Sequence, residues 1–305
     1  MHRKWHNITV LALALVLLAS CGNDDDSSDK PDSPVGPSLE SKIPLNVMAL
    51  ADDGEMSTIV DAGLYMQHYV DGKKSELIAD ANYLNNLKLT YTSGHWQFAD
   101  PAFWYDDASL SDLYVYVPYQ QSVPDSRKVG LKVPTDQNNS ENLALADFMW
   151  GQCLAVAPTD KNIDVKLSHR LSRVKIKVMP DDSFKEGELK PADVTVYVKS
   201  VQCDGTFDLQ TGELSVTGNK QSICAHNNGD FTFSAIVMPQ SLGFVNMLQI
   251  DCNNGASYTI QDSFVYEPQK SCLISVTINK KQVTGLNVDI GGWDIDDKDY
   301  GGTVQ

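Results

Sequence analysis

The chain has 305 residues, with 24 lysines and arginines against 40 aspartates and glutamates, and a formal net charge of -16. This acidity argues against a nucleic-acid partner, because phosphate binding needs a basic surface, and it suits a soluble protein whose copies repel one another. The length allows one large domain or two modest ones.

Residues 1–20 have the pattern of a signal peptide. A short basic start precedes a mostly apolar run from Ile8 to Leu18, which is too short to cross a bilayer, since a spanning helix needs about 20 residues. Small residues then lead to Cys21, as in the lipobox, where the cysteine thiol is acylated before cleavage. We therefore expect a lipid on Cys21 to anchor the mature protein in a membrane; the alternative is an ordinary secretory signal with a chance cysteine.

Residues 21–41 are predicted to be a disordered acidic tether. They are rich in Asp, Ser, Gly and Pro and hold too little apolar surface to offset the entropy of ordering. The acidic run directly after Cys21 resembles the surface-export signal of lipoproteins in Bacteroides-type bacteria, which implies the outer leaflet of the outer membrane. The plainer alternative is that Asp and Ser are good spacer residues.

The rest of the chain alternates apolar and polar residues, and only Glu141–Phe148 could form a short helix. Other alternating runs lie near 165–167, 194–198, 231–238, 248–251, 257–260, 273–278 and 286–290, with turn residues between them. Many short strands with regular turns favour an all-β fold of sandwiches over a parallel sheet. In the clearest strand, core positions alternate with cations: Leu171, Val174, Ile176 and Val178 with Arg173, Lys175 and Lys177.

A polar, proline-flanked segment at 180–191 falls between two of these strands. Segments of this composition are typical of loops and linkers. The sequence therefore predicts an N-terminal β-sandwich over residues 42–182 and a C-terminal β-sandwich over residues 190–305.

The sequence shows no enzyme motif. A G-x-S-x-G elbow, a phosphate-binding glycine loop and an H-E-x-x-H helix are all missing. His169, between Ser168 and Arg170, is the one tempting histidine, but a lone strand histidine is more often structural than catalytic. We expect no catalytic residue, no cofactor and no metal.

Two residue clusters have a structural and a functional interpretation each. The acidic tail could suggest calcium, but Lys298 stands at the third ligand position of the EF-hand pattern, so a solvated tail is favoured. An aromatic cluster could stack on a sugar ring or pack a core. The tail residues are Asp294, Asp296, Asp297 and Asp299, and the aromatic residues are Trp96, Phe98, Phe103, Trp104 and Tyr105.

The cysteines beyond Cys21 form an odd set without C-x-x-C spacing, so no metal framework or redox motif follows. A bridge between Cys203 and Cys224 is possible in an oxidising periplasm. The others sit in strand-like contexts where buried free thiols are common. Pairing stays open among Cys153, Cys203, Cys224, Cys252 and Cys272.

Four stretches, taken in order, resemble landmarks of the fimbrillin family of Bacteroides-type bacteria. They are LYVYVPY at 113–119, VKLSHRLSRV at 165–174, AIVMPQ at 235–240 and IGGW at 290–293. The resemblance implies two transthyretin-like (Greek-key) β-sandwich domains in tandem. It also implies a structural role as a surface pilus subunit that supports adhesion.

In that family, subunits are exported as lipoproteins, and an Arg- or Lys-specific protease removes the first strand. A strand from a neighbouring subunit then fills the groove, by strand addition. The resemblance places the displaced strand here at Ile43–Leu50, with Ile43, Leu45 and Val47 on one face. Lys42 is a possible cut site, but a cut there would free the strand together with the body. An open edge aggregates unless it is capped, so cleavage would switch assembly on.

The chain departs from that pattern, because no Lys or Arg lies between Ile43 and Tyr69. A cut after the first strand therefore lacks its substrate residue. A subunit that keeps its lipid and first strand would be an anchor, whereas a tail with only Thr303 and Val304 as strand-like residues favours a tip or accessory subunit. Two other classes stay open: a stand-alone surface lipoprotein that binds glycans, and a hydrolase whose residues only the fold would bring together.

Overall fold

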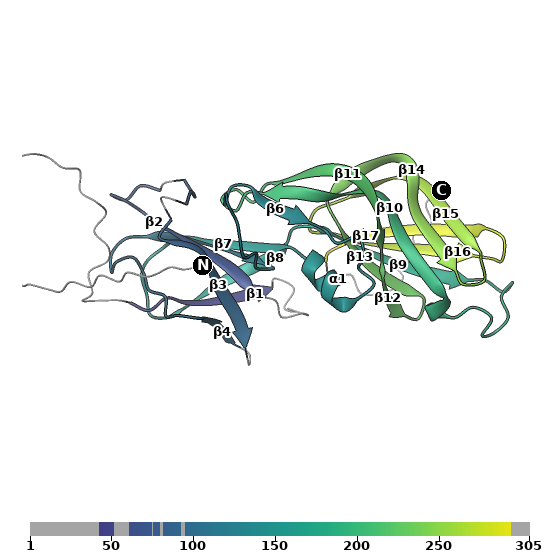
Figure 1. The fold of residues 1–305 in the computed structure, drawn as a ribbon, viewed down its shortest axis with the longest axis horizontal. Helices are drawn as coiled ribbons and strands as arrows, with labels where there is room; N and C mark the ends of the chain where they lie inside the picture. Colours follow the sequence, from purple (N-terminus) through teal and green to yellow (C-terminus); the bar gives the residue numbers. More distant parts are fainter. Residues whose placement is uncertain (1–42, 52–60, 75, 80–81, 93–94, 294–305) are drawn as a thin grey trace, which may run out of the picture. The chain divides into compact units, whose positions relative to one another are not determined.

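The computed structural model describes residues 43–51, 61–74, 76–79, 82–92 and 95–293. These residues form 17 β-strands with one short α-helix and one 3-10 turn, arranged in one seven-stranded and two five-stranded sheets (Figure 1). The prediction of an all-β fold is confirmed. No helix in this part of the chain is long and apolar enough to cross a bilayer.

The seven-stranded sheet has the order β1-β8-β7-β5-β2-β3-β4. Its outermost pair, β1 and β8, is parallel, and the other pairs are antiparallel. The central strands β2 and β5 are buried along almost their whole length, which is why their sequences lack simple alternation. The bounds are β1 Asn46–Ala51, β2 Ala62–His68, β3 Leu84–Thr92, β4 His95–Phe98, β5 Ser111–Val117, β7 Met149–Val156 and β8 Asn162–His169.

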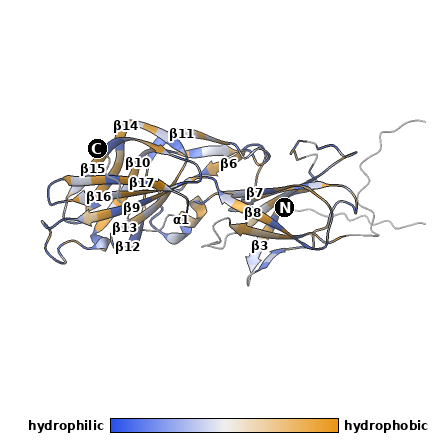
Figure 2. Cartoon of the chain, turned by 180° about the vertical axis from the view of Figure 1, so that it is seen from behind, coloured by the Kyte–Doolittle hydropathy of each residue, from blue (hydrophilic) through white to orange (hydrophobic). Residues whose placement is uncertain are grey.

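The remaining strands form two sheets, β11-β10-β14-β15 with β6 beside β10, and β12-β13-β9-β16-β17. In β9, β10 and β15 apolar and polar residues alternate, as predicted, and the hydropathy of the strands can be followed in Figure 2. Strands β13 and β16 are instead buried along almost their whole length. The bounds are β6 Val129–Lys132, β9 Ser172–Pro180, β10 Val194–Phe207, β11 Leu214–Cys224, β12 His226–Gly229, β13 Thr232–Val237, β14 Gln240–Cys252, β15 Ser257–Tyr266, β16 Ser271–Ile278 and β17 Val283–Gly291.

The predicted helix is present as α1, Ser140–Ala146. Its N-cap is Asn139, whose side-chain oxygen accepts a hydrogen bond from the backbone N–H of Asn142 at 2.7 Å, as polar residues at this position commonly do. The 3-10 turn η1 covers Pro191–Asp193 and leads into β10.

Buried apolar side chains form two clusters. The first core belongs to the seven-stranded sheet, and the second core is built mainly by the strands of the two five-stranded sheets. Strand β5 contributes to both: Leu113, Val115 and Val117 lie in the first core, and Tyr114 and Tyr116 lie in the second. This division follows from the period of two along a strand.

The predicted boundary between residues 182 and 190 does not coincide with a division between sheets. Strand β9, which precedes it, pairs with β13 and β16, which both follow it. The chain instead leaves the seven-stranded sheet between β8 and β9 and then forms the two five-stranded sheets. Earlier in the chain, between β5 and β7, strand β6 already pairs with β10 of a five-stranded sheet. The described residues from 43 to 293 also cluster as one compact unit. The polar, proline-flanked segment 180–191 is a surface loop between β9 and β10. Surface loops and domain linkers have the same composition, so the sequence did not distinguish them.

Gly151 of β7 lies against β8: a Cβ added there would be 2.0 Å from the carbonyl oxygen of Lys166. Only a residue without a side chain allows so close an approach. We expect Gly151→Ala to lower the free energy of unfolding by about 2 kcal/mol, measured by urea titration. Gly130→Ala is the matched control, because nothing lies within 4 Å of the added atom. Equal losses in the two variants would contradict the packing argument.

Candidate functional site

The predicted first strand is the terminal strand of its sheet. Strand β1 runs parallel to β8, with register pairs from Asn46 and Asn162 to Ala51 and Leu167. Alternate side chains enter the first core, and the exposed fractions are 3% for Leu45, 4% for Val47 and 2% for Ala49. Ile43 packs partly against the same core. Ile43, Leu45 and Val47 therefore all face the first core, and their displacement during assembly stays a prediction.

The other edge of this segment is also bonded. The backbone N–H of Leu45 donates to the carbonyl oxygen of Ala102 at 2.9 Å, and that of Trp104 donates to the carbonyl oxygen of Ile43 at 3.0 Å. The indole Nε1 of Trp96 donates to the carbonyl oxygen of Ala49 at 2.8 Å. We call the space between β8 on one side and residues 102–104 with Trp96 on the other the first-strand slot.

Three residues of the aromatic cluster, Trp96, Phe103 and Trp104, lie along this slot. Trp104 is 2% exposed, and its Nε1 donates to the carbonyl oxygen of Thr159 at 2.8 Å. Trp96 and Phe98 pack against the first core, and Tyr105 stacks on His68 with ring centroids 3.7 Å apart. None of the five aromatic residues, Phe103 included, is fully exposed. The geometry favours the core interpretation over a sugar-stacking platform.

A Lys- or Arg-specific protease can release the first strand only if a lysine or arginine lies next to it in the chain. Cys21 and Lys42, the predicted lipidation and cut sites, lie outside the described residues. On the C-terminal side of β1, the first basic residues are Lys73 and Lys74, which follow β2. Because β2 lies between β3 and β5, a cut there would detach a central strand together with β1.

Lys74 is also held by a buried carboxylate. Its Nζ lies 2.6 Å from Oδ2 of Asp112, whose side chain is 0% exposed. The same carboxylate accepts hydrogen bonds from the hydroxyl of Tyr69 at 3.0 Å, the hydroxyl of Tyr114 at 3.2 Å and the backbone N–H of Ala155 at 2.8 Å. Burial, followed by the neighbouring Asp112, raises the pKa of Tyr114. Asp112 therefore joins β5, β7 and the loop after β2, a structural role.

His169 is built into a packing junction. Its Nδ1 lies 2.7 Å from Oδ1 of Asp147, and its ring stacks on Trp293 with centroids 3.9 Å apart and planes at 11°. The next residue, Arg170, lies over the Trp150 ring at 5.3 Å and donates through Nη2 to the carbonyl oxygen of Gly212. Burial lowers the pKa of Arg170. These contacts support the structural interpretation of His169. They also join the landmark stretch 165–174 to the stretch 290–293, far away in sequence.

Metal-ligating side chains are not gathered anywhere in the described ranges: no group of three His, Cys, Asp or Glu there could hold an ion. The four tail aspartates considered for calcium, from Asp294 to Asp299, lie outside those ranges.

The cysteines at 153, 203, 224, 252 and 272 are all free thiols, so the possible bridge between Cys203 and Cys224 is not formed. Burial raises the pKa of every one of them, to about 11 for Cys203 and about 12 for Cys272.

Since only the thiolate attacks alkylating reagents, we expect Cys203 and Cys272 to react with iodoacetamide at pH 8 at least ~10-fold more slowly in the folded protein than in urea. Cys153 and Cys224, which are partly exposed, should react first. Peptide mass spectrometry after timed quenching measures the rates. Equal rates for all thiols in the native protein would be incompatible with this burial.

Solved structures with a similar fold come from Bacteroides species. A candidate cell adhesion protein from Bacteroides uniformis superposes with a TM-score of 0.66 at 21% identity, covering 84% of this chain and 99% of that one. Another from Bacteroides ovatus gives 0.64 at 18%, covering 85% and 100%, and a fimbrial protein from Bacteroides vulgatus gives 0.53 at 14%, covering 82% and 99%. These likenesses show a shared fold.

No curated protein sequence matches the chain. The model of one protein family, described as fimbrillin-like, matches residues 53–293. That range includes every strand from β2 to β17, the His169–Trp293 junction and both sides of the first-strand slot. Because the match covers most of its length, the chain belongs to the fimbrillin-like family.

Proposed function

We propose that this protein is a fimbrial subunit at the cell surface that joins its neighbours by β-strand exchange and supports adhesion. The observation that carries the proposal is the first-strand slot. Strand β1 lies at the end of its sheet, and its alternate side chains fill the first core. Without β1, the edge of β8 and the places of Leu45, Val47 and Ala49 would stand open to a strand of the same pattern.

The energetics of strand addition fit this slot. A replacement strand would gain the ladder hydrogen bonds along β8, and its apolar side chains would replace those of β1 in the core. Unpaired edges invite uncontrolled pairing, so a strand that keeps the slot filled until assembly protects the subunit. An acidic surface supports the same end by keeping free subunits apart.

For the position in the fimbria, we propose an anchor, or a tip or accessory subunit, rather than a stalk subunit. The support is the lack of Lys and Arg between Ile43 and Tyr69 together with the central place of β2. A Lys- or Arg-specific protease that cut at Lys73 would damage the sheet. A subunit that keeps β1 and is cut at neither Lys30 nor Lys42 also keeps the tether 21–41 and, with it, the proposed lipid on Cys21 in the outer membrane.

We further infer two transthyretin-like domains with revised limits. The N-terminal one would comprise 43–117 and 149–169, and the C-terminal one 129–146 and 172–291, preceded by the signal peptide and tether. The separate sheets support this division, although Tyr114, Tyr116 and Trp150 of the N-terminal part contribute to the second core. Calorimetry should then resolve two unfolding transitions, while a single transition with equal calorimetric and van't Hoff enthalpies would favour one cooperative unit.

The decisive experiment supplies the missing cleavage residue. In Met56→Arg the segment between β1 and β2 gains a site for an Arg-specific protease, and Met56→Gln is the matched control. After proteolysis, the cut variant should exchange β1 for a labelled peptide of residues 43–51, while the control should not. A peptide carrying Val47→Asp should fail to exchange. If the cut variant takes up no peptide, or both peptides equally, strand exchange in this slot is refuted.

The position is tested on the native cell surface by mass spectrometry. A chain that is still acylated on Cys21 and retains residues 43–51 fits an anchor or an accessory subunit. An SDS-resistant ladder of chains that lack both would instead identify a stalk subunit. Binding of the monomer to mucin or plant glycans without any multimer would favour the alternative, a stand-alone glycan-binding lipoprotein.

A further inference from the structure

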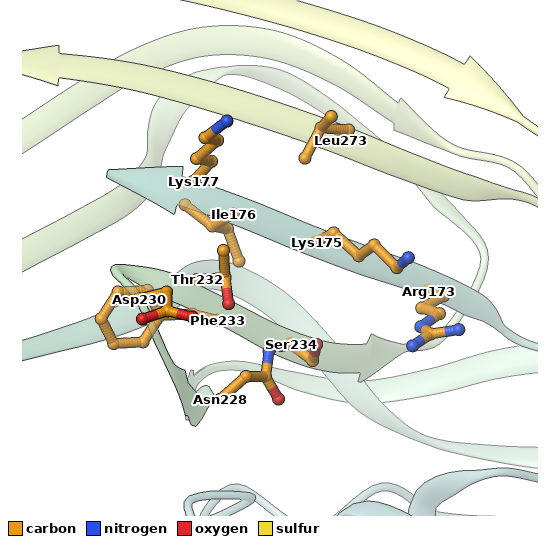
Figure 3. A pocket seen from close by; sticks show the side chains of 10 residues that line it. All are labelled: Arg173, Lys175, Ile176, Lys177, Asn228, Asp230, Thr232, Phe233, Ser234 and Leu273. Atoms are coloured by element: carbon orange, nitrogen blue, oxygen red, sulfur yellow. Dashed lines mark hydrogen bonds between the residues drawn. The ribbon is translucent and has the colours of Figure 1, made fainter. Parts of the chain in front are cut away.

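A cationic groove runs along the outer face of β9. Arg173, Lys175 and Lys177 point away from the second core, whereas Val174 and Ile176 between them are buried in it. The groove has a volume of about 400 Å³. Figure 3 shows its cations spaced along one strand, with β13 and β16 on either side. Its further lining residues include Asn228, Asp230, Thr232, Ser234 and Leu273.

The strand register fixes the spacing of the groove. Lys175 is level with Ser234 on β13 and with Leu273 on β16. Alternate residues of a strand are about 6.6 Å apart, so the three cations cover about 13 Å. In a chain whose formal charge is -16, this row of three cations is a local reversal of sign. A groove of this kind fits an extended, acidic segment.

Two side chains on the groove face are buried although they belong to neither core. Leu273 is 9% exposed, yet among the described residues it is the one buried apolar side chain that belongs to neither core. Ser271, on the same side of β16, has a buried hydroxyl for which the described residues provide no hydrogen-bond partner. Buried polar atoms normally have partners. Together the two residues indicate that something lies over this face.

The chain's own C-terminal segment begins beside the groove. Gly291, the last residue of β17, pairs with Ser271, which is itself level with Arg173. Trp293 then stacks on His169, only a few residues before β9. The twelve residues 294–305 hold four aspartates and one lysine, and they can extend up to ~40 Å, which is well beyond the length of the groove.

We propose that residues 294–305 dock in the groove of β9 as an acidic strap. In an extended chain Ile295, Asp297 and Asp299 fall on one side, with the spacing of alternate strand residues. Ile295 then packs on Leu273, and the two aspartates reach the lysines. Charge-assisted hydrogen bonds of this type are among the stronger polar contacts, and tethering to β17 gives the strap a high effective concentration. The proposal does not depend on the pilus assignment.

Zero-length carbodiimide crosslinking of the full chain tests the strap. We expect isopeptide bonds from Lys175 or Lys177 to Asp297 or Asp299 within a monomer, located by peptide mass spectrometry. The ion pair between Lys280 and Glu188 is the internal positive control. Replacing Asp297 and Asp299 by asparagine should remove the bonds. Control crosslinks without strap crosslinks overturn the proposal, and strap crosslinks confined to dimers assign the groove to a second copy instead.

A binding measurement separates the strap from a general anion site. A chain that ends at Trp293 keeps every described residue, and it should bind a labelled peptide of residues 294–305 at least ~10-fold more tightly than the full chain does. Lys177→Glu should weaken this binding by at least ~10-fold, as should raised salt, which screens exposed charges. Lys220→Glu, on exposed β11, is the matched control. Equal binding by the truncated and full chains, or equal effects of the two lysine variants, overturns the proposal.

Discussion

Replacing Asp112 by asparagine is expected to lower the free energy of unfolding by about 3 kcal/mol. The carboxylate is fully buried and accepts from four donors: Lys74, Tyr69, Tyr114 and the backbone of Ala155. The amide of asparagine removes the charge that balances Lys74 and turns an N–H group toward at least one of these donors. A donor that loses its acceptor inside the protein is costly. Urea unfolding at neutral pH measures the change.

Asp107→Asn is the control for this prediction, because Asp107 is exposed and surface changes usually stay within ~0.5 kcal/mol. Lys74→Ala should cost less than Asp112→Asn, since Lys74 is 36% exposed and Asp112 keeps three donors. If Asp112→Asn costs no more than Asp107→Asn, the carboxylate does not hold β5, β7 and the loop after β2 together.

Introducing a carboxylate on the buried face of β1 is the second large effect. Val47 is 4% exposed and lies in the first core, where an unpaired charge costs several kcal/mol. Val47→Asp should therefore release β1 from the slot, and we expect the amides of residues 46–51 to lose their protection. Hydrogen exchange measured by mass spectrometry detects this loss even where the second core stays folded.

Leu50→Asp provides the comparison on the same strand, because the side chain of Leu50 is 38% exposed. We expect its amide protection to match that of the natural chain within a factor of about 3, since an exposed carboxylate pays little desolvation. If both variants release β1, strand propensity rather than core filling holds the strand. If neither does, the hydrogen bonds to β8 and to residues 102–104 hold it without the side chains.

Several features could be predicted from the sequence because they are local. The alternation along β9 placed Val174 and Ile176 inside and the cations outside, as the structure has them. A similar alternation placed Leu45 and Val47 on one face of the segment 43–50, and both side chains are buried in the first core. The short helix was also predicted, with its N-terminus within two residues of the observed one. Each of these depends only on the period of side chains along one element.

The domain boundary could not be predicted in this way. The alternation in β8 and in β9 predicts two half-buried strands, but it does not identify the strands with which they pair. The partners of β9 lie about 55 to 100 residues away along the chain, on β13 and β16. A slot residue such as Trp96 was recognised only as an aromatic residue with two interpretations, because the bond from its indole to Ala49 crosses 47 positions.

The sequence by itself therefore determined the all-β class, the faces of the strands and the order of the family landmarks. Backbone geometry turns successive side chains to opposite sides whatever surrounds them, so these features need no knowledge of distant residues. Only the tertiary structure decided that β1 lies parallel to β8, that His169 meets Trp293 and that Asp112 is buried beside Lys74. Those contacts are set by hydrogen bonding and packing summed over the whole chain, in which each strand competes for every available edge.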